Sequence, residues 1–171
     1  MKRTSSRTTH EGEIVSVRID EFEYEDGESA EREIVAHPGA VAIVAHDEKR
    51  FFMVRQPREP VGEEALLELP AGKLDEEGET PLQCAQRELV EEVGVEAADW
   101  RELKRVYTSP GFSDEQVHLF IATDLTRVDP QPSEGERIEI VEVPLADLDD
   151  AIDSCADAKS LIGLLLFRAE R

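Results

Sequence analysis

The sequence predicts one domain of the α/β or α+β class, in which strands are mixed with a few helices. The chain has 171 residues, an ordinary length for a single domain. Hydrophobic residues make up 40% of the chain, which is enough for a real core. Short strand-like runs stand before and after one amphipathic helical segment, and this mixture is typical of a layered fold.

The N-terminal part predicts an exposed tail followed by a hairpin. Residues 1–12 are basic and polar and lack the apolar stretch of a secretory signal, so we expect a disordered or frayed tail. Residues 13–24 and 30–37 have strand character, and the Asp-Gly pair at 26–27 is a hairpin signal. Residues 13–37 are therefore predicted to form an antiparallel N-terminal β-hairpin.

The rest of the chain, residues 38–171, is predicted to form the main body of the fold. Strands are expected at 39–45, 51–56, 66–69, 100–107, 116–123 and 137–143, and helices between Thr80 and Gly94 and at 144–152 and 157–169. The apolar run at 161–167 is too short to span a bilayer, and we expect it to dock the last helix onto the core.

The segment that follows Gly72 predicts a capped amphipathic helix. Thr80 or Glu79 would cap its start, and Pro81 suits its first turn. Gly94 stands where a left-handed helix stop is expected. The apolar residues fall on one stripe of this helix: Leu82, Ala85, Leu89 and Val93.

The other side of this helix is acidic. Glu88, Glu91 and Glu92 lie close together on it, and crowding of like charges costs helix stability. A hard cation such as Mg²⁺ would offset that cost. A solvated acidic face would explain the glutamates equally well, but it would not explain why the string Arg-Glu-Leu-x-Glu-Glu-x-Gly-Val appears with Glu79 eight residues before Arg87. Arg87 is expected to pair with Glu79 or Glu91.

Composition restricts the partners. The chain has 40 acidic and 19 basic residues and a net charge of −21, which argues against a nucleic-acid or anionic-membrane surface. The basic residues are five lysines and fourteen arginines, and we keep adaptation to high salt as a hypothesis for this acidic, lysine-poor chain. Two cysteines without a CxxC pair argue against a disulfide framework or a zinc site. The expected compartment is the cytoplasm.

The string from Glu79 to Val95, E-x7-R-E-L-x-E-E-x-G-V, resembles the signature of the Nudix hydrolase family, G-x5-E-x7-R-E-U-x-E-E-x-G-U with U apolar. Gly72 stands seven positions before Glu79 rather than six, so one residue is added in the loop around 76–77. The resemblance implies a Nudix-type α/β/α sandwich around a mixed β-sheet, and the order of the expected elements agrees with that fold.

The resemblance also implies a metal site. Carried over from the family, Glu88, Glu91 and Glu92 hold Mg²⁺ or Mn²⁺, two or three ions in number, and the carbonyl of Ala71 adds a ligand. Glu91 and Glu92 would take part in catalysis. A loop glutamate often serves as general base in relatives, which makes Glu134 the candidate base and Glu136 a candidate additional ligand, although an acidic surface loop explains both nearly as well.

Four further segments resemble the ADP-ribose pyrophosphatase branch of the family, at 32–41, 54–58, 67–73 and 109–115. Pro110 stands fifteen residues after Val95, where ADP-ribose enzymes carry a marker proline. The substrate-binding residues implied by these segments are Arg32, Glu33, Arg58, Lys73, Ser109, Pro110, Gly111 and Glu115, and Glu115 is also a candidate to place the water.

The function implied by the resemblance is Mg²⁺-dependent hydrolysis of ADP-ribose to AMP and ribose 5-phosphate. Another nucleoside diphosphate sugar, such as ADP-glucose or GDP-mannose, remains an alternative substrate. A protein that binds ADP-ribose without cleaving it is an alternative of another class. Relatives form homodimers in which the N-terminal hairpin contributes to the partner, so a homodimer is expected here.

Overall fold

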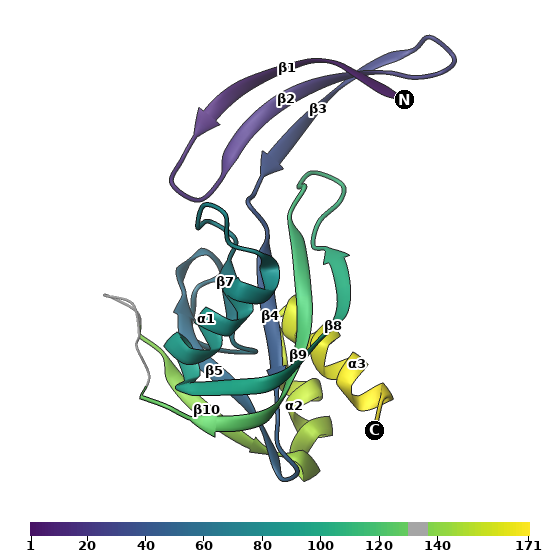
Figure 1. Ribbon diagram of the computed structural model, residues 1–171. Helices are drawn as coiled ribbons and strands as arrows, with labels where there is room; N and C mark the ends of the chain where they lie inside the picture. Colours follow the sequence, from purple (N-terminus) through teal and green to yellow (C-terminus); the bar gives the residue numbers. More distant parts are fainter. Residues whose placement is uncertain (130–136) are drawn as a thin grey trace. The chain divides into compact units, whose positions relative to one another are not determined.

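The computed structural model describes residues 1–129 and 137–171, which form two compact units (Figure 1). Unit 1 comprises Met1–Gly39 and Tyr107–Gln116, and unit 2 comprises Ala40–Val106 and Val117–Arg171. In the described part of the chain, no helix has the length and apolar character needed to cross a membrane.

Unit 1 contains a three-stranded antiparallel sheet in the order β1-β2-β3. Its strands are β1 (Lys2–Glu11), β2 (Ser16–Glu23) and β3 (Ser29–Ala36). The predicted hairpin corresponds to β2 and β3, which pair in register from Ser16 opposite Ala36 to Glu23 opposite Ser29. Gly27, at φ 84°, donates its N–H to Tyr24 O in the turn, a left-handed conformation that glycine adopts without strain.

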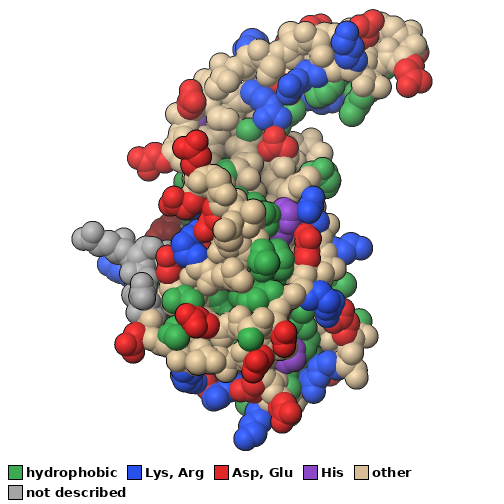
Figure 2. Space-filling model, in the orientation of Figure 1, with side chains coloured by type: hydrophobic (Ala, Val, Ile, Leu, Met, Phe, Trp, Pro, Cys, Tyr) green, Lys and Arg blue, Asp and Glu red, His purple; other side chains and the backbone are tan. Residues whose placement is uncertain are grey.

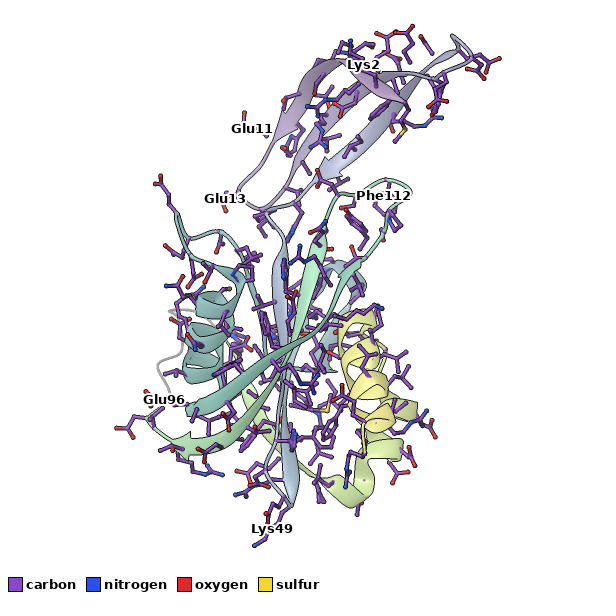
Figure 3. The ribbon with its side chains drawn as sticks, turned by 45° about the vertical axis from the view of Figure 1, so that its right-hand side comes forward. Lys2, Glu11, Glu13, Lys49, Glu96 and Phe112 are labelled. Atoms are coloured by element: carbon purple, nitrogen blue, oxygen red, sulfur yellow. The ribbon has the colours of Figure 1, made fainter. Side chains whose placement is uncertain are left out.

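The prediction of a frayed tail at residues 1–12 is wrong, because Lys2–Glu11 form β1 against β2 (Figure 3 labels both ends). The reason lies in Asp20 on β2, which is only 1% exposed. Its carboxylate accepts hydrogen bonds from Ser6 and Arg3 on β1 and from Arg18 on β2. A buried carboxylate requires such partners, so a polar segment without apolar residues is ordered as a strand.

Unit 2 contains a mixed sheet and an antiparallel sheet. The mixed sheet has the order β7-β4-β9-β8, in which β4 runs parallel to β9 and antiparallel to β7. The second sheet has the order β10-β5-β6. The strands are β4 (Ala40–Ala45), β5 (Arg50–Arg58), β6 (Glu63–Glu68), β7 (Ala71–Lys73), β8 (Val95–Tyr107), β9 (Gln116–Arg127) and β10 (Glu139–Pro144).

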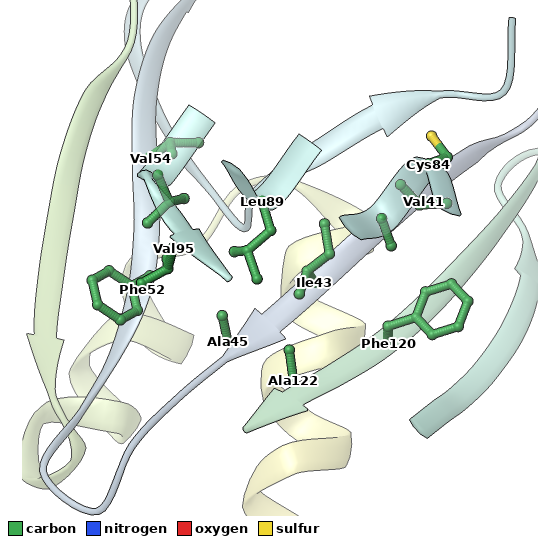
Figure 4. Close-up of a cluster of buried hydrophobic side chains, with 12 residues drawn as sticks. Val41, Ile43, Ala45, Phe52, Val54, Cys84, Leu89, Val95, Phe120 and Ala122 are labelled. Carbon is green, nitrogen blue, oxygen red and sulfur yellow. The ribbon is translucent and has the colours of Figure 1, made fainter. Parts of the chain in front are cut away.

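The helices of unit 2 cover both faces of the mixed sheet (Figure 1). They are α1 (Pro81–Val93), α2 (Leu148–Ser154) and α3 (Ala158–Ala169), with single 3₁₀ turns at η1 (Glu59–Val61) and η2 (Leu145–Asp147). Strand β4 is buried on both faces. Val41, Ile43 and Ala45 pack with Leu89 of α1 in the cluster of Figure 4.

The opposite face of β4 packs toward α3. Val44 shares a cluster with Leu164 and Phe167 of α3, and Ala42 shares another with Leu119 of β9. Alternation of side chains along one strand therefore supplies two cores. This arrangement confirms the predicted α/β/α sandwich around a mixed sheet.

The expected elements are present with shifted ends, and besides β1 two were not predicted. The short strand β7 was missed, as was the turn η1 between β5 and β6. The helix expected at 144–152 begins as η2 and continues as α2.

Acidic side chains are interspersed with Lys and Arg on the face shown in Figure 2.

Candidate functional site

Helix α1 in unit 2 is fixed at both ends by its sequence. Thr80 is the N-cap, and its hydroxyl accepts the Gln83 N–H while Gln83 Oε1 accepts the Thr80 N–H, a complete capping box. Pro81 opens the first turn. Gly94 closes the helix at φ 68° and donates its N–H to Val90 O. The predicted caps are thus confirmed, with Thr80 rather than Glu79 at the start.

The buried face of α1 differs from the predicted stripe at one position. Ala85, Leu89 and Val93 are buried as expected, but Leu82 is 38% exposed and Cys84 is buried instead. Burial raises the pKa of Cys84 to about 12, so its thiol stays protonated at neutral pH. Cys84 is therefore a packing residue.

Two carboxylates of α1 are buried against strand β7. Glu88 is 9% exposed and Glu92 is 5% exposed. Glu92 Oε2 accepts the Ala71 N–H at 3.0 Å. A Cβ atom at Gly72 would lie 2.0 Å from Cδ and 2.1 Å from Oε1 of Glu88, so the carboxyl group of Glu88 occupies the place of a side chain at Gly72. The glycine before the helix therefore makes room for a glutamate on it.

Arg87 organises the neighbouring carboxylates. Its Nε and Nη2 donate to the two oxygens of Glu79 at 3.0 Å each. Its Nη1 donates to Glu88 Oε1 at 2.7 Å and to Glu91 Oε2 at 3.0 Å. The hydrogen bonds from Arg87 lower the pKa of Glu79, and those to Glu79 raise the pKa of Arg87. The expected pairing of Arg87 with Glu79 and Glu91 is present, and Glu88 joins it.

The donor chemistry of this region fits a divalent cation. Glu88, Glu91 and Glu92 offer carboxylate oxygens, the ligands that Mg²⁺ and Mn²⁺ prefer. Across residues 1–129 and 137–171, however, no three metal-binding side chains converge on a preformed ligand set. Arg87 contacts one oxygen of Glu88 and one oxygen of Glu91, so it offsets part of their negative charge in the absence of a cation.

Four more residues were predicted to bind substrate or metal or to act as the base: Arg58, Lys73, Glu134 and Glu136. Arg58 forms an ion pair with the buried Glu68, with Nη2 at 2.6 Å from Oε2. Lys73 pairs with Asp75 at 3.0 Å at the surface. Glu134 and Glu136 lie outside the described residues, and their predicted roles as base and ligand stay predictions.

Unit 1 contains a cavity of about 400 Å³. Four residues predicted for substrate binding line it: Arg32, Glu33, Pro110 and Gly111. Arg32 is held by its Nη1 to Glu31 O at 2.8 Å and by its Nη2 to the Tyr24 hydroxyl at 3.3 Å. Segments more than seventy positions apart in the sequence therefore meet in one pocket.

The aromatic lining of this cavity was not predicted. Tyr24 and Tyr107, the two tyrosines of the chain, line it together with Phe22 and Phe112. Phe112, at the loop between β8 and β9 (Figure 3), is 59% exposed. The sequence held a signal for this lining. Aromatic residues make up only 5% of the chain, and some of these few stand beside the predicted contact residues.

The loop between β8 and β9 is pinned to β3 within unit 1. Ser109 O accepts the N–H groups of Phe112 and Ser113, and Phe112 O accepts the Val35 N–H at 2.8 Å. Asp114 accepts Arg18 Nη2 at 2.8 Å and the His37 N–H at 3.0 Å. The N–H groups of Phe112 and Ser113 are therefore engaged in this turn.

Ser109 and Glu115 have their own contacts. Among the cavity-lining residues of unit 1, neither is present. Glu115 accepts the Thr108 hydroxyl at 2.6 Å and lies 3.6 Å from His37 Nδ1. Their predicted roles toward substrate stay predictions.

Comparison with known proteins adds a family and several relatives. Residues 35–162 match the NUDIX domain. The chain is 42% identical over 146 residues to an ADP-ribose pyrophosphatase of Bacillus subtilis (strain 168), covering 84% of this chain and 78% of that protein. It is 42% identical over 137 residues to a methanol dehydrogenase activator of Bacillus methanolicus, covering 78% and 73%. It is 48% identical over 125 residues to an ADP-ribose pyrophosphatase of Mycobacterium tuberculosis (strain ATCC 25618 / H37Rv), covering 72% and 60%.

A solved structure has the same fold. The crystal structure of an ADP compounds hydrolase aligns with a TM-score of 0.84, covering 99% of this chain and 94% of that chain. The sequences are 24% identical, so this likeness bears on the fold alone. It agrees with the sandwich of a mixed sheet between helices.

Proposed function

The chain belongs to the NUDIX domain family and is a Nudix hydrolase, and we propose that it cleaves the diphosphate of ADP-ribose to give AMP and ribose 5-phosphate. The names of two relatives, at 42% and 48% identity, support this substrate. The four sequence segments that resemble the ADP-ribose branch agree with this substrate.

The observation that carries the proposal is the buried pair Glu88 and Glu92, placed against the backbone of Gly72 and Ala71. Both carboxylates have hydrogen-bond donors, Arg87 for Glu88 and the Ala71 N–H for Glu92, which offset the cost of burial and hold the carboxylate oxygens in place. Together with Glu91 and the carbonyl of Ala71, they would hold Mg²⁺ or Mn²⁺. A divalent cation supplies neutralisation of the diphosphate charge and a lowered pKa of bound water.

Side chains of the protein would position the carboxylates, activate the water and bind the phosphates. Arg87 holds Glu88 and Glu91 in place before a cation arrives. Glu91 and Glu92 would orient the attacking water, and Glu134 would take its proton, with Glu136 as an additional ligand. Arg58 and Lys73 would donate to phosphate oxygens, because cationic donors form the stronger charge-assisted bonds.

The cavity of unit 1 supports a nucleoside-sized ligand. Its volume of about 400 Å³ lies within the range of small-molecule sites. Tyr24 and Tyr107 offer ring faces for a planar base. Arg32 and Glu33 offer a donor and an acceptor for ring nitrogens or ribose hydroxyls. Pro110, Gly111 and neighbouring Ser109 and Glu115 would contact the sugar.

A substrate panel tests the proposal. Purified protein with Mg²⁺ would be incubated with ADP-ribose, ADP-glucose, GDP-mannose, NADH and dATP, and the products separated by chromatography. We expect AMP and ribose 5-phosphate from ADP-ribose at the highest kcat/KM, and loss of turnover in EDTA. The matched Glu92→Gln variant should lose at least about a hundredfold in kcat, since it removes a charge from the site.

Other results would select the alternatives. Faster turnover of ADP-glucose or GDP-mannose would make the protein a pyrophosphatase for that nucleotide sugar. Saturable ADP-ribose binding without turnover in Mg²⁺ or Mn²⁺ would make it a non-catalytic binder, and would contradict the proposed function.

We also propose that the protein is a homodimer. The three-stranded sheet of unit 1 is small, and isolated small sheets gain stability from further packing. Light scattering after size exclusion should give about 38 kDa, twice the 19.2 kDa chain. A mass of one chain at all concentrations would exclude the dimer.

A further inference from the structure

A buried carboxylate in unit 2 that the proposed chemistry has not used is surrounded by basic and amide groups. Glu68, at the end of β6, is 2% exposed. Its oxygens accept Arg58 Nε at 3.0 and 3.2 Å, Arg58 Nη2 at 2.6 Å and Gln56 Nε2 at 3.2 Å. Lys159 Nζ donates to Glu68 Oε1 at 3.1 Å. Glu68 therefore fixes one edge of the Arg58 guanidinium.

The start of α3 supplies the other half of this network. Lys159 also donates to Asp157 Oδ2 at 2.8 Å, so it bridges two carboxylates. Asp157 caps α3 by accepting the N–H and the hydroxyl of Ser160. The hydroxyl of Ser160, which is fully buried, accepts the Leu69 N–H at 2.7 Å. Helix α3 is thus tied to both Glu68 and the residue after it.

The same backbone segment leads directly to the carboxylates of α1. Pro70 O accepts the Ile43 N–H at 2.9 Å, which anchors the segment to β4. The next residue, Ala71, donates its N–H to Glu92. Only two residues therefore separate Glu68 from the backbone group that holds Glu92.

Arg58 lies within the electrostatic reach of this site. Burial lowers the pKa of Arg58, but its hydrogen bonds to Glu68 and the negative charges of Glu68, Glu92 and Asp157 more than offset this and raise it. Nη1 of Arg58 donates to no group in the part of the chain that the structure describes, while Nε and Nη2 are engaged by Glu68. One edge of the guanidinium is fixed and the other remains for a ligand.

We propose that Lys159, supported by Asp157 and Ser160, is a positioning residue of the hydrolase: it holds Glu68 and, through Glu68, presents the Nη1 edge of Arg58 to an anionic oxygen of the substrate. This inference rests on the proposed function, since it needs a diphosphate substrate. Without the Lys159 charge, the carboxylates of Glu68 and Asp157 lose the cation that bridges them. Glu68 then reorients, and Arg58 loses its fixed edge.

A double-mutant cycle tests the inference. The Michaelis constants for ADP-ribose would be measured in the wild type, Lys159→Met, Arg58→Met and the double variant. We expect each single variant to raise KM about tenfold or more with a smaller change in kcat, because an arginine–phosphate contact made in the ground state is lost. The double variant should be no worse than Arg58→Met alone, because Lys159 acts through Arg58.

Two control variants and one kinetic criterion separate positioning from folding. Lys159→Arg keeps the bridging charge and should restore KM to within about threefold of the wild type. Lys104→Met removes an exposed lysine that has no ion pair within the described residues, and should leave KM unchanged. A partly unfolded variant would lower apparent kcat at unchanged KM, so unfolding cannot imitate the expected result.

The outcomes are distinct. If the wild type cleaves ADP-ribose but the effects of Lys159→Met and Arg58→Met add, or if Lys159→Met changes only kcat, the inference is overturned and the proposed function stands. If the wild type cleaves no member of the substrate panel, the proposed function fails and this inference fails with it. Calorimetric Kd values for ADP-ribose in EDTA should show the same coupling between the two positions without turnover.

Discussion

Gly72 has no side chain, and the carboxyl group of Glu88 occupies the space that a side chain there would fill. A Cβ there would lie 2.0 to 2.2 Å from three atoms of Glu88. Glu88 is a flexible side chain and can turn away, so Gly72→Ala should cost only about 1 kcal/mol in the free energy of unfolding. The displaced carboxylate should lower kcat/KM for ADP-ribose at least about tenfold. Urea denaturation and steady-state kinetics measure the two effects.

Gly163→Ala is the matched control for this substitution. A Cβ at Gly163 would lie 2.6 Å from Cδ1 of the fully buried Leu69, within the core. Overpacking of a core costs about 1 to 3 kcal/mol, so this variant should lose stability while its folded fraction keeps a kcat closer to that of the wild type. Equal losses of activity in the two variants would contradict the role given to Gly72.

The Arg87–Glu79 pair predicts a defined pH dependence of stability. The pKa of Glu79 is lowered below its usual 4.5 in the folded state, chiefly by hydrogen bonds from Arg87. A lowered carboxyl pKa stabilises the fold above the unfolded value, and this contribution disappears as the pH falls through the folded value. Glu79→Gln should therefore destabilise by about 1 to 2 kcal/mol at pH 7, and by less at pH 3, which lies below the unfolded-state value. Urea denaturation at both pH values decides this, and a pH-independent difference would contradict it.

Sequence reasoning reached some residues of the candidate site and missed others for a physical reason. The contact of Arg87 with Glu91 follows from their i,i+4 spacing along α1, which a sequence shows directly, and Glu79 lies just before the N-cap of the same helix. The contacts of Glu68 with Arg58 and Lys159 join β6, β5 and α3 across up to 91 positions. Only tertiary packing brings those groups together, so no local sequence pattern predicts these contacts.

At the scale of elements, α1 and β1 show opposite relations between sequence and structure. The α1 segment carries its own caps in Thr80 and Gly94, so its limits were predictable. Strand β1 has no buried residue and no apolar alternation. This segment forms a strand because it pairs with β2 and because its side chains bind the buried Asp20. Neither interaction can be predicted from the strand propensity of the segment itself. Strand β7 was missed because three residues are too few for a periodic pattern.

Strand β1 can be tested by hydrogen exchange. Burial raises the pKa of Asp20, but hydrogen bonds from Ser6, Arg18 and Arg3 more than offset this and lower it. Two of these three donors come from β1, so the strand and the carboxylate stabilise each other. We expect amides of Lys2–Glu11 to exchange at least about tenfold more slowly than in an unstructured peptide, and Ser6→Ala to speed their exchange. Random-coil exchange rates for this segment would contradict the strand and would support the frayed tail that the sequence predicted.

At the scale of the whole molecule, the dominant feature is a net charge of −21. Like charges repel over about 10 Å at 0.1 M salt and over about 3 Å at 1 M salt, so salt should relieve self-repulsion in the folded state. Many of the carboxylates are paired with arginine at the surface, and salt weakens those pairs too. Exposed pairs contribute little, so the repulsion should decide the sign.

We therefore expect Tm to rise by about 2 to 8 °C between roughly 0.05 M and 1 M KCl, which corresponds to about 1 to 2 kcal/mol for a chain of this size. The scan should be made by calorimetry in EDTA, because a cation bound at Glu88, Glu91 and Glu92 would raise Tm by mass action. Repeating it with millimolar MgCl₂ at fixed ionic strength separates the two effects, since screening depends on ionic strength and site binding on the ion. A Tm that falls with KCl would mean that the surface ion pairs outweigh the repulsion, and would remove the physical basis for the high-salt hypothesis.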